Sequence, residues 1–178
     1  MGRDADKAQF DAIVTPHLPD ALALARWLSG NRVDAEDIVQ EASLRAYRSI
    51  NTYSGGDRRA WVLTIVRNTA YTWLAKNRPP VVISLDGVSS AERESMEHAQ
   101  GFAITPETEL ISRIDAACLE AAITALPVEF RETFVLREIH GLDYRQIAEI
   151  TSSPLGTIMS RLTRARRRLI DALGVEQR

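Results

Sequence analysis

Cysteine is almost absent from this chain of 178 residues, and long apolar runs are missing altogether. The single Cys118 excludes an internal disulfide and a cysteine-based metal cluster. Because Cys118 lies among alanines and apolar residues, we expect it to be a small buried side chain. No apolar run approaches the length of a membrane span, and residues 1–10 lack the apolar centre of a signal peptide. We therefore expect a soluble cytoplasmic protein with no membrane insertion.

The residue clusters that carry catalysis are also missing. His17, His98 and His140 are scattered, without the spacing of metal ligands or of a catalytic triad. The short stretch SGG at residues 54–56 is too short to cradle a phosphate, and no pair of carboxylates suggests acid–base catalysis. The sequence therefore predicts a protein that is not an enzyme, with no catalytic residue, no metal and no cofactor.

Helix-forming residues dominate two stretches of the chain, and a segment of different composition separates them. Residues 78–110 contain three of the seven prolines and carry six acidic against two basic side chains. This composition predicts a flexible acidic linker. We expect an all-α fold of two small helical domains, an N-terminal module at residues 5–77 and a C-terminal module at residues 111–175.

The C-terminal module ends in a helix-turn-helix pattern. Asp143 and Gln146 fit a capping box at the start of a short helix, and the turn at residues 151–153 separates it from a longer helix at residues 154–172. We expect Ser153 to cap this longer helix. Its apolar side is expected to pack on the short helix through Leu155, Ile158, Leu162, Ala165 and Leu169.

The opposite side of the longer helix is basic, although the net charge of the whole chain is −2. No acidic residue lies between Glu149 and Asp171. Arginine pairs with phosphates and guanine edges, and the second helix of a helix-turn-helix enters the DNA major groove. We expect contacts to base edges from Thr157, Ser160 and Arg164. Phosphate contacts are expected from Arg161, Arg166, Arg167 and Arg168. The alternative is a solvated basic face that binds nothing.

Two helices organise the N-terminal module. The first is expected to begin at Asp34, whose side chain can cap the free amides of the first turn. Its buried stripe runs from Ala35 to Ala46. Gly55 and Gly56 then force a break, and the second helix is expected from about Arg58 to Lys76. Apolar residues surround this second helix nearly completely, which predicts that it is buried against its neighbours.

Three stretches in order resemble the extracytoplasmic-function (ECF) sigma factors of the bacterial sigma-70 family. They are DAEDIVQEASLRAYRSI, RRAWVLTIVRNTA and LPVEFRETFVLREIHGLDYRQIAEITSSPLGTIMSRLTRARRRL. The resemblance covers nearly the whole chain and is far more specific than a lone helix-turn-helix. It implies that sigma domains 2 and 4 are joined by a linker of variable sequence. It also implies a transcription initiation factor that binds core RNA polymerase and promoter DNA and is controlled by an anti-sigma factor.

The same resemblance implies roles for the N-terminal module. The helix that begins at residue 34 matches the main polymerase-binding element of the family. Its interface is then formed by Asp34, Asp37, Gln40, Glu41 and Leu44. Acids around an apolar anchor suit a basic partner surface. The alternative is the ordinary solvated charge of a surface helix.

Residues 51–59 resemble the loop that captures a base flipped out of the promoter −10 element. Tyr53 is then expected to form a wall of the base pocket, and Asn68 to help read the base. The backbone phosphates are assigned to Arg58, Arg59 and Arg67. Tyr53 equally fits a core-capping role, whereas Trp61 and Trp73 are expected in the core.

The resemblance also implies that the last helix reads the promoter −35 element as duplex. Met159 stands where some relatives carry a basic residue, which leaves the preferred −35 bases open. Two other functions remain in competition: a conventional regulator that binds operator DNA, and a sigma-like decoy that titrates an anti-sigma factor. The polymerase-binding helix argues against the first, and the intact basic face argues against the second.

Overall fold

A computed structural model describes residues 3–77 and 116–174. All of the regular elements in these ranges are helical, which confirms the all-α prediction. The proposed linker at residues 78–110 lies outside the described residues. Among the described helices, none combines the length and the apolar composition needed to cross a membrane.

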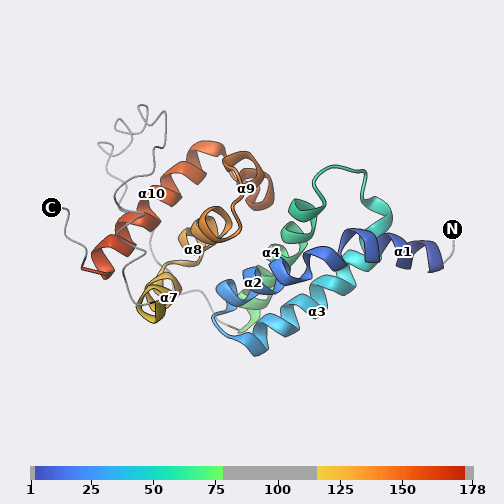
Figure 1. The fold of residues 1–178 in the computed structure, drawn as a ribbon, viewed down its shortest axis with the longest axis horizontal. Helices are drawn as coiled ribbons and strands as arrows, with labels where there is room; N and C mark the ends of the chain where they lie inside the picture. The colour runs from blue at the N-terminus through green and yellow to red at the C-terminus, as the bar shows by residue number, and fades with distance from the viewer. Residues whose placement is uncertain (1–2, 78–115, 175–178) are drawn as a thin grey trace.

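The N-terminal module is built around three packed helices (Figure 1). Its elements are α1 (Arg3–Ile13), a 3-10 turn (Thr15–His17), α2 (Leu18–Ser29), α3 (Arg32–Ser49), a second 3-10 turn (Ile50–Thr52) and α4 (Arg58–Asn77). Helices α2, α3 and α4 contact one another pairwise. Leu24, Ile38 and Leu63 are at most 1% exposed between them, so this half of the chain has a core of its own.

The start of α3 differs from the expectation. Gly30 ends α2 in the left-handed region, with φ of +83°, and the chain turns back at Asn31. The Asn31 side chain then accepts a hydrogen bond from the backbone N–H of Asp34 at 2.8 Å. Asn31 rather than Asp34 therefore caps the helix, because the extended backbone of Asn31 brings its side chain over the free amides. Asp34 lies in the first turn, where its charge suits the helix dipole.

The C-terminal module consists of α7 (Ala116–Ala125), α8 (Val128–Phe134), a π-helical turn (Val135–Ile139), α9 (Tyr144–Thr151) and α10 (Leu155–Ala172). Helix α8 continues directly into the π-helical turn. The predicted capping box at α9 is confirmed, because Asp143 and Gln146 exchange side-chain-to-backbone hydrogen bonds. Ile147, Ile158 and Leu162 form the centre of this core and are at most 2% exposed.

Two local expectations for this module are wrong. Ser153 does not cap α10, since its hydroxyl donates to the Thr151 carbonyl at 3.3 Å and Pro154 occupies the cap position. Cys118 is exposed, because α7 buries only its inner face around Ile123.

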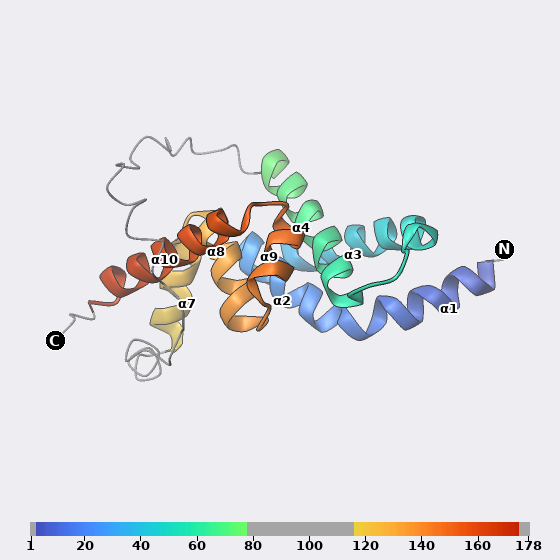
Figure 2. The ribbon, with the colours of Figure 1, turned by 90° about the horizontal axis from the view of Figure 1, so that it is seen from above.

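The two modules pack directly against each other. Helix α8 contacts α2, and α9 contacts α4, as the ribbon shows from two directions (Figures 1 and 2). Arg131 of α8 donates to the carbonyl of Trp27 at 3.0 Å, close to the C-terminal end of α2. A cation at this end of a helix satisfies terminal carbonyls and complements the helix dipole.

Candidate protein and nucleic-acid interfaces

Helix α3 carries a continuous strip of exposed side chains on one side. Its members are spaced by three or four residues, so they share one helix face. We call this set the α3 strip: Val33, Asp37, Gln40, Leu44 and Tyr47. Val33 is 70% exposed, Leu44 49% and Tyr47 39%, which are high values for apolar side chains on a helix with a buried opposite face. Exposed apolar side chains beside a carboxylate are typical of a protein-binding surface.

The other two predicted polymerase-binding residues lie at the margin of this strip. Asp34 is half-buried, and its carboxylate accepts a hydrogen bond from the Asn31 amide. Glu41 is exposed and pairs with Arg45 along the helix, with 2.9 Å between Oε1 and Nε. An exposed pair of this kind contributes little to stability. Both carboxylates therefore remain near the surface, but each already interacts with a neighbour.

The loop before α4 is organised by Tyr53. The Tyr53 hydroxyl donates to the Gly56 carbonyl at 2.6 Å, and its ring meets the Trp61 ring edge-on with 5.4 Å between centroids. Gly55 and Gly56 have φ of +100° and +101°, a conformation that favours glycine. The half-buried Tyr53 ring thus closes the loop against Trp61, and one part of it stays accessible.

Arg58 and Arg59 begin α4 and lie in different environments. Arg58 is exposed, whereas Arg59 is half-buried and pairs with Asp20 of α2, with 2.6 Å between Nε and Oδ2. The other Asp20 oxygen lies 3.7 Å from Nδ1 of His140 in the C-terminal module. Burial lowers the pKa of His140, and the nearby Asp20 carboxylate only partly offsets this effect.

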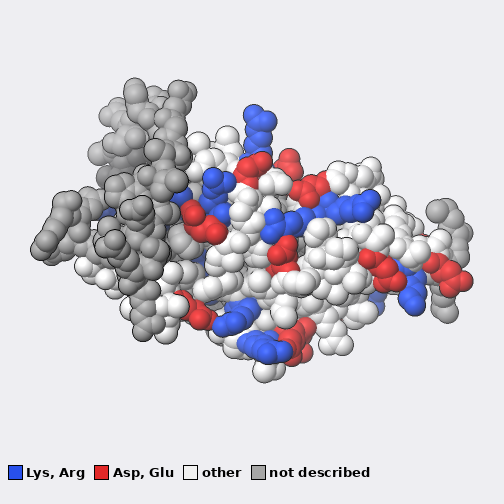
Figure 3. All heavy atoms as spheres, in the orientation of Figure 1, with Lys and Arg blue, Asp and Glu red and all other residues white. Residues whose placement is uncertain are grey.

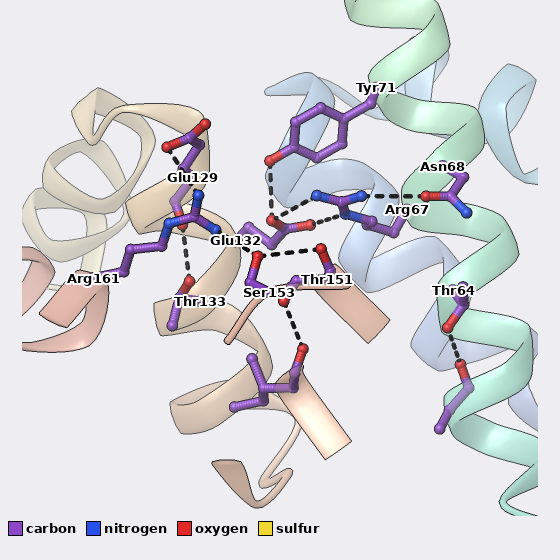
Figure 4. Close-up of polar contacts among 12 residues, drawn as sticks. Thr64, Arg67, Asn68, Tyr71, Glu129, Glu132, Thr133, Thr151, Ser153 and Arg161 are labelled. Atoms are coloured by element: carbon purple, nitrogen blue, oxygen red, sulfur yellow. Dashed lines mark hydrogen bonds and ion pairs between the residues drawn. The ribbon is translucent and has the colours of Figure 1, made fainter. Parts of the chain in front are cut away.

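Arg67 and Asn68 lie in the middle of α4, and the Arg67 side chain reaches α8 of the C-terminal module (Figure 4). Asn68 is exposed, and its side-chain oxygen accepts from Arg67 at 3.2 Å. Arg67 also pairs with Glu132 of α8, with 2.7 Å between Nε and Oε1. Burial by itself lowers the pKa of Arg67. The hydrogen bond and the negative charge of Glu132 outweigh burial, so the pKa of Arg67 is raised. The structure therefore brings these two predicted −10 residues together.

Helix α10 is held by four fully buried positions and turns its polar residues outward. Ile158, Leu162, Ala165 and Leu169 are at most 2% exposed. Leu155 was expected in this stripe but is 42% exposed, because it is the first residue of the helix and precedes the four buried positions. The side opposite this stripe is the candidate DNA-binding surface.

The predicted DNA contacts on α10 divide by exposure. Arg167 and Arg168 are exposed. The remaining five are half-buried: Thr157, Ser160, Arg161, Arg164 and Arg166. None of the seven is fully buried, and their role in DNA binding stays a prediction.

Some of these arginines already contact groups of the C-terminal module. Arg161 lies 3.3 Å from a Glu129 oxygen, and Arg166 lies 2.6 Å from one of Glu138. The Arg168 guanidinium lies over the Phe130 ring at 5.3 Å. Basic and acidic side chains are interspersed on the face drawn in Figure 3. The sequence could not predict this pairing, because the acids belong to α8 and the adjoining π-helical turn.

The comparisons with known proteins agree with this division into two modules. Residues 13–79 match the family model for sigma-70 region 2, and residues 116–169 match the model for sigma-70 region 4. The chain is 34% identical over 168 residues to the ECF RNA polymerase sigma-E factor of Haemophilus influenzae, which covers 92% of this chain and 87% of that protein. The chain belongs to the ECF sigma factors of the sigma-70 family. Members of this family are transcription initiation factors.

Two further relatives extend the comparison. The ECF sigma factor SigE of Mycolicibacterium smegmatis is 35% identical over 180 residues, which cover 97% of this sigma factor and only 64% of that relative's length. A sigma factor RpoE, crystallised with the anti-sigma factor NepR from Bartonella quintana, is 28% identical with a TM-score of 0.68, covering 94% of this chain and 98% of that chain. CnrH, solved with the cytosolic domain of CnrY, shares the fold at 22% identity and a TM-score of 0.59, over 94% of this chain and 89% of that one.

Sequence reasoning missed two surface residues of this sigma factor. Val33 and Tyr47 belong to the α3 strip; Tyr47 lies on the same face as Leu44 within the predicted helix, and a helical projection begun one residue earlier would have included Val33. Met159, at which the resemblance left the preferred −35 bases open, is 39% exposed on α10 beside the expected base contacts. Within the two described ranges, no group of three metal-binding side chains comes together.

Proposed function

We propose that this sigma factor binds core RNA polymerase through the α3 strip and reads its promoter with both modules. The observation that carries the proposal is the presence of regions 2 and 4 in one chain, each with a separate exposed surface. The strip combines an apolar anchor, Leu44, with the carboxylate of Asp37, which suits a basic partner surface. The margin of this interface includes Asp34 and Glu41, with Gln40 at its centre.

The N-terminal module is proposed to hold the single-stranded −10 element at the start of α4. Tyr53 offers a ring face and a polar edge beside the loop, and Asn68 offers a side-chain amide for a base edge. Arg58 is exposed there, and Arg59 and Arg67 can reach phosphates once they leave their carboxylate partners. Residues 5–77 are proposed as the polymerase-binding and −10-binding domain.

The C-terminal module is proposed to place α10 in the major groove of the −35 element. Thr157, Ser160 and Arg164 lie in the N-terminal half and middle of the helix, where base edges are read. The phosphate contacts are assigned to Arg161, Arg166, Arg167 and Arg168, with the last two exposed already. Residues 111–175 are proposed as this domain, and residues 78–110 as the linker between the two.

An anti-sigma factor is proposed to control this protein in the cytoplasm. The support is that a structural neighbour, the sigma factor RpoE, was crystallised in complex with the anti-sigma factor NepR. A partner of this kind would cover the α3 strip or the α10 face. The α3 strip is exposed, and on the α10 face Arg167 and Arg168 are exposed.

A gel-shift experiment tests the proposed function. The protein is mixed with fully duplex promoter DNA, with core RNA polymerase, or with both. We expect a specific shift only when core polymerase is present. A strong specific shift by the protein alone would instead indicate a conventional duplex-binding regulator. Core binding without promoter DNA binding would indicate a decoy.

A further inference from the structure

An uncharged strip of exposed residues runs along one side of α10. Leu155 and Met159 lie one helical turn apart and are 42% and 39% exposed. Gly156 and Thr163 are exposed beside them. The Thr163 hydroxyl donates to the Met159 carbonyl at 3.0 Å, so the helix itself satisfies this hydroxyl. We call Leu155, Gly156, Met159 and Thr163 the α10 apolar strip.

The packing of the described residues does not account for the glycine in this strip. Gly156 lies in the first turn of α10 and is not among the glycines with positive φ, so its backbone suits any residue. Among the described residues, a Cβ on Gly156 would meet no heavy atom within 4 Å beyond the adjoining backbone. Alanine is the better helix former at such a position. A glycine there allows the helix backbone to approach another molecule closely.

The surroundings of the strip are basic. The exposed Arg167 follows Thr163 by one turn, and Arg164, a proposed base contact, lies on the neighbouring face. The one carboxylate bound to this margin of α10, that of Glu138, is paired with Arg166 at 2.6 Å. An apolar strip between arginines suits a partner that combines negative charge with small apolar groups, which is the character of a DNA groove.

Thymine supplies the apolar group that such a strip fits. Among the base edges of unmodified DNA in the major groove, only thymine presents a methyl group. Methionine is flexible and polarizable, so it adapts to a small apolar partner. Met159 and Arg164 are separated by five residues, or about 7.5 Å along the helix. Base pairs stack at about 3.4 Å, so the two side chains face different base pairs.

We propose that Met159 selects a thymine in the −35 element by contact with its methyl group. Leu155 extends the apolar contact, and Gly156 lets the start of α10 come close to the base edges. The proposal rests on the −35 role proposed above for α10. It deepens that role by adding a preferred base and the residue that reads it.

Replacing thymine by uracil tests this contact, because uracil lacks only the methyl group and pairs with adenine in the same way. A promoter is first identified from the start sites that the protein adds to core polymerase. Each thymine of its −35 element, on either strand, is then replaced by uracil, and binding of the holoenzyme to each duplex is measured by competition. We expect wild type to bind about fourfold more weakly at one or two of these positions, the effect of one buried methyl group.

Two variants remove the apolar end of Met159. Met159→Ala shortens the side chain, and Met159→Gln keeps its length but ends in an amide. We expect both to bind thymine and uracil duplexes equally at the sensitive positions, because the two changes remove the same contact. The matched control is Ile170→Ala, a half-buried apolar residue about three turns further along the same side of α10. This control should keep the fourfold preference, and circular dichroism checks the helix content of every variant.

Gly156→Ala tests the close approach of the helix. The space around this position is open, so we expect the thermal unfolding midpoint to stay the same or to rise. Promoter binding should nevertheless weaken about fivefold or more, since an added methyl group overpacks a tight contact. Promoter binding at wild-type affinity would overturn the close approach.

Failure of this inference is distinguishable from failure of the proposed function. If the wild-type holoenzyme binds equally well after the −35 element is randomised, the proposed −35 role of α10 fails. If the −35 element is needed but no uracil weakens binding, or if Met159→Ala still prefers thymine over uracil, the reading of thymine by Met159 is overturned. Weaker binding of Met159→Ala to core polymerase without DNA would indicate a protein partner for the strip and would also overturn the inference.

Discussion

Leu44 offers the sharpest test of the proposed polymerase interface. It belongs to the α3 strip and is 49% exposed, so about half of its side chain is available to a partner. Replacing it by alanine removes apolar surface from the interface and introduces no new charge. Alanine also has the highest helix propensity, so α3 is expected to stay intact. We expect Leu44→Ala to weaken core polymerase binding and to leave the fold unchanged.

The magnitude follows from the exposed fraction. Fully burying a leucine side chain is worth about 1.5–3 kcal/mol. The half that becomes buried on docking therefore contributes about 0.8–1.5 kcal/mol, which corresponds to a dissociation constant about 4- to 13-fold weaker. The half already buried limits the loss in the free energy of unfolding to about 1 kcal/mol. A buried leucine such as Leu24 would cost about 2–5 kcal/mol on the same substitution.

The assay is a titration of dye-labelled protein with core polymerase, followed by fluorescence anisotropy. The matched control is Leu155→Ala, since Leu155 is 42% exposed but lies on α10 in the other module. We expect the control to bind core polymerase with wild-type affinity. Unchanged binding by Leu44→Ala, or an equal loss in both variants, would refute the assignment of the α3 strip.

Three further predictions address the DNA surfaces and the buried histidine. Arg164→Ala should weaken promoter binding by the holoenzyme by about 1–3 kcal/mol and relax the preference at one −35 position, whereas Arg167→Ala should weaken binding to all promoters alike and reduce the slope of log affinity against log salt concentration by about 1. Binding measured on a set of −35 variants distinguishes these two effects. An equal effect of Arg164→Ala on every sequence would argue against base reading by Arg164. Asn68→Ala should slow open-complex formation, measured by permanganate footprinting, more than it weakens core binding, and equal losses would contradict the role in reading a −10 base. His140 is held neutral by burial, so the unfolded chain binds its proton more readily, and stability should fall as the pH drops through the ordinary pKa of 6.5. Denaturant midpoints between about pH 7.5 and about pH 5.5 should therefore fall less in His140→Asn than in wild type, and parallel curves would contradict this explanation.

The fold was predictable where local chemistry decides it. Helix α4 was expected from about Arg58 to Lys76, and the structure has it from Arg58 to Asn77. The capping box at Asp143 was predictable because both of its partners lie within one turn. The prediction of Asp34 as the cap of α3 was wrong. Asn31 and Asp34 are both favourable capping residues, and the turn after Gly30 decides between them.

The site was less predictable, because its contacts join distant parts of the chain. Periodicity identified the outward face of α10 but not the ion pair of Arg166 with Glu138, 28 positions away. Nothing local indicates that Glu132 is buried, since its partners Arg67 and Tyr71 are more than sixty positions away. Long-range polar contacts of this kind depend on how the modules pack. They leave no periodic pattern in the sequence from which they could be predicted.

The most direct test of the central claim is to transcribe genomic DNA with core polymerase in the presence and absence of this protein and to sequence the transcripts. The account predicts that the protein adds a defined set of start sites, preceded by shared −10 and −35 sequences. It also predicts that Arg164→Ala weakens or redistributes these start sites. The same transcripts with and without the protein would contradict the account.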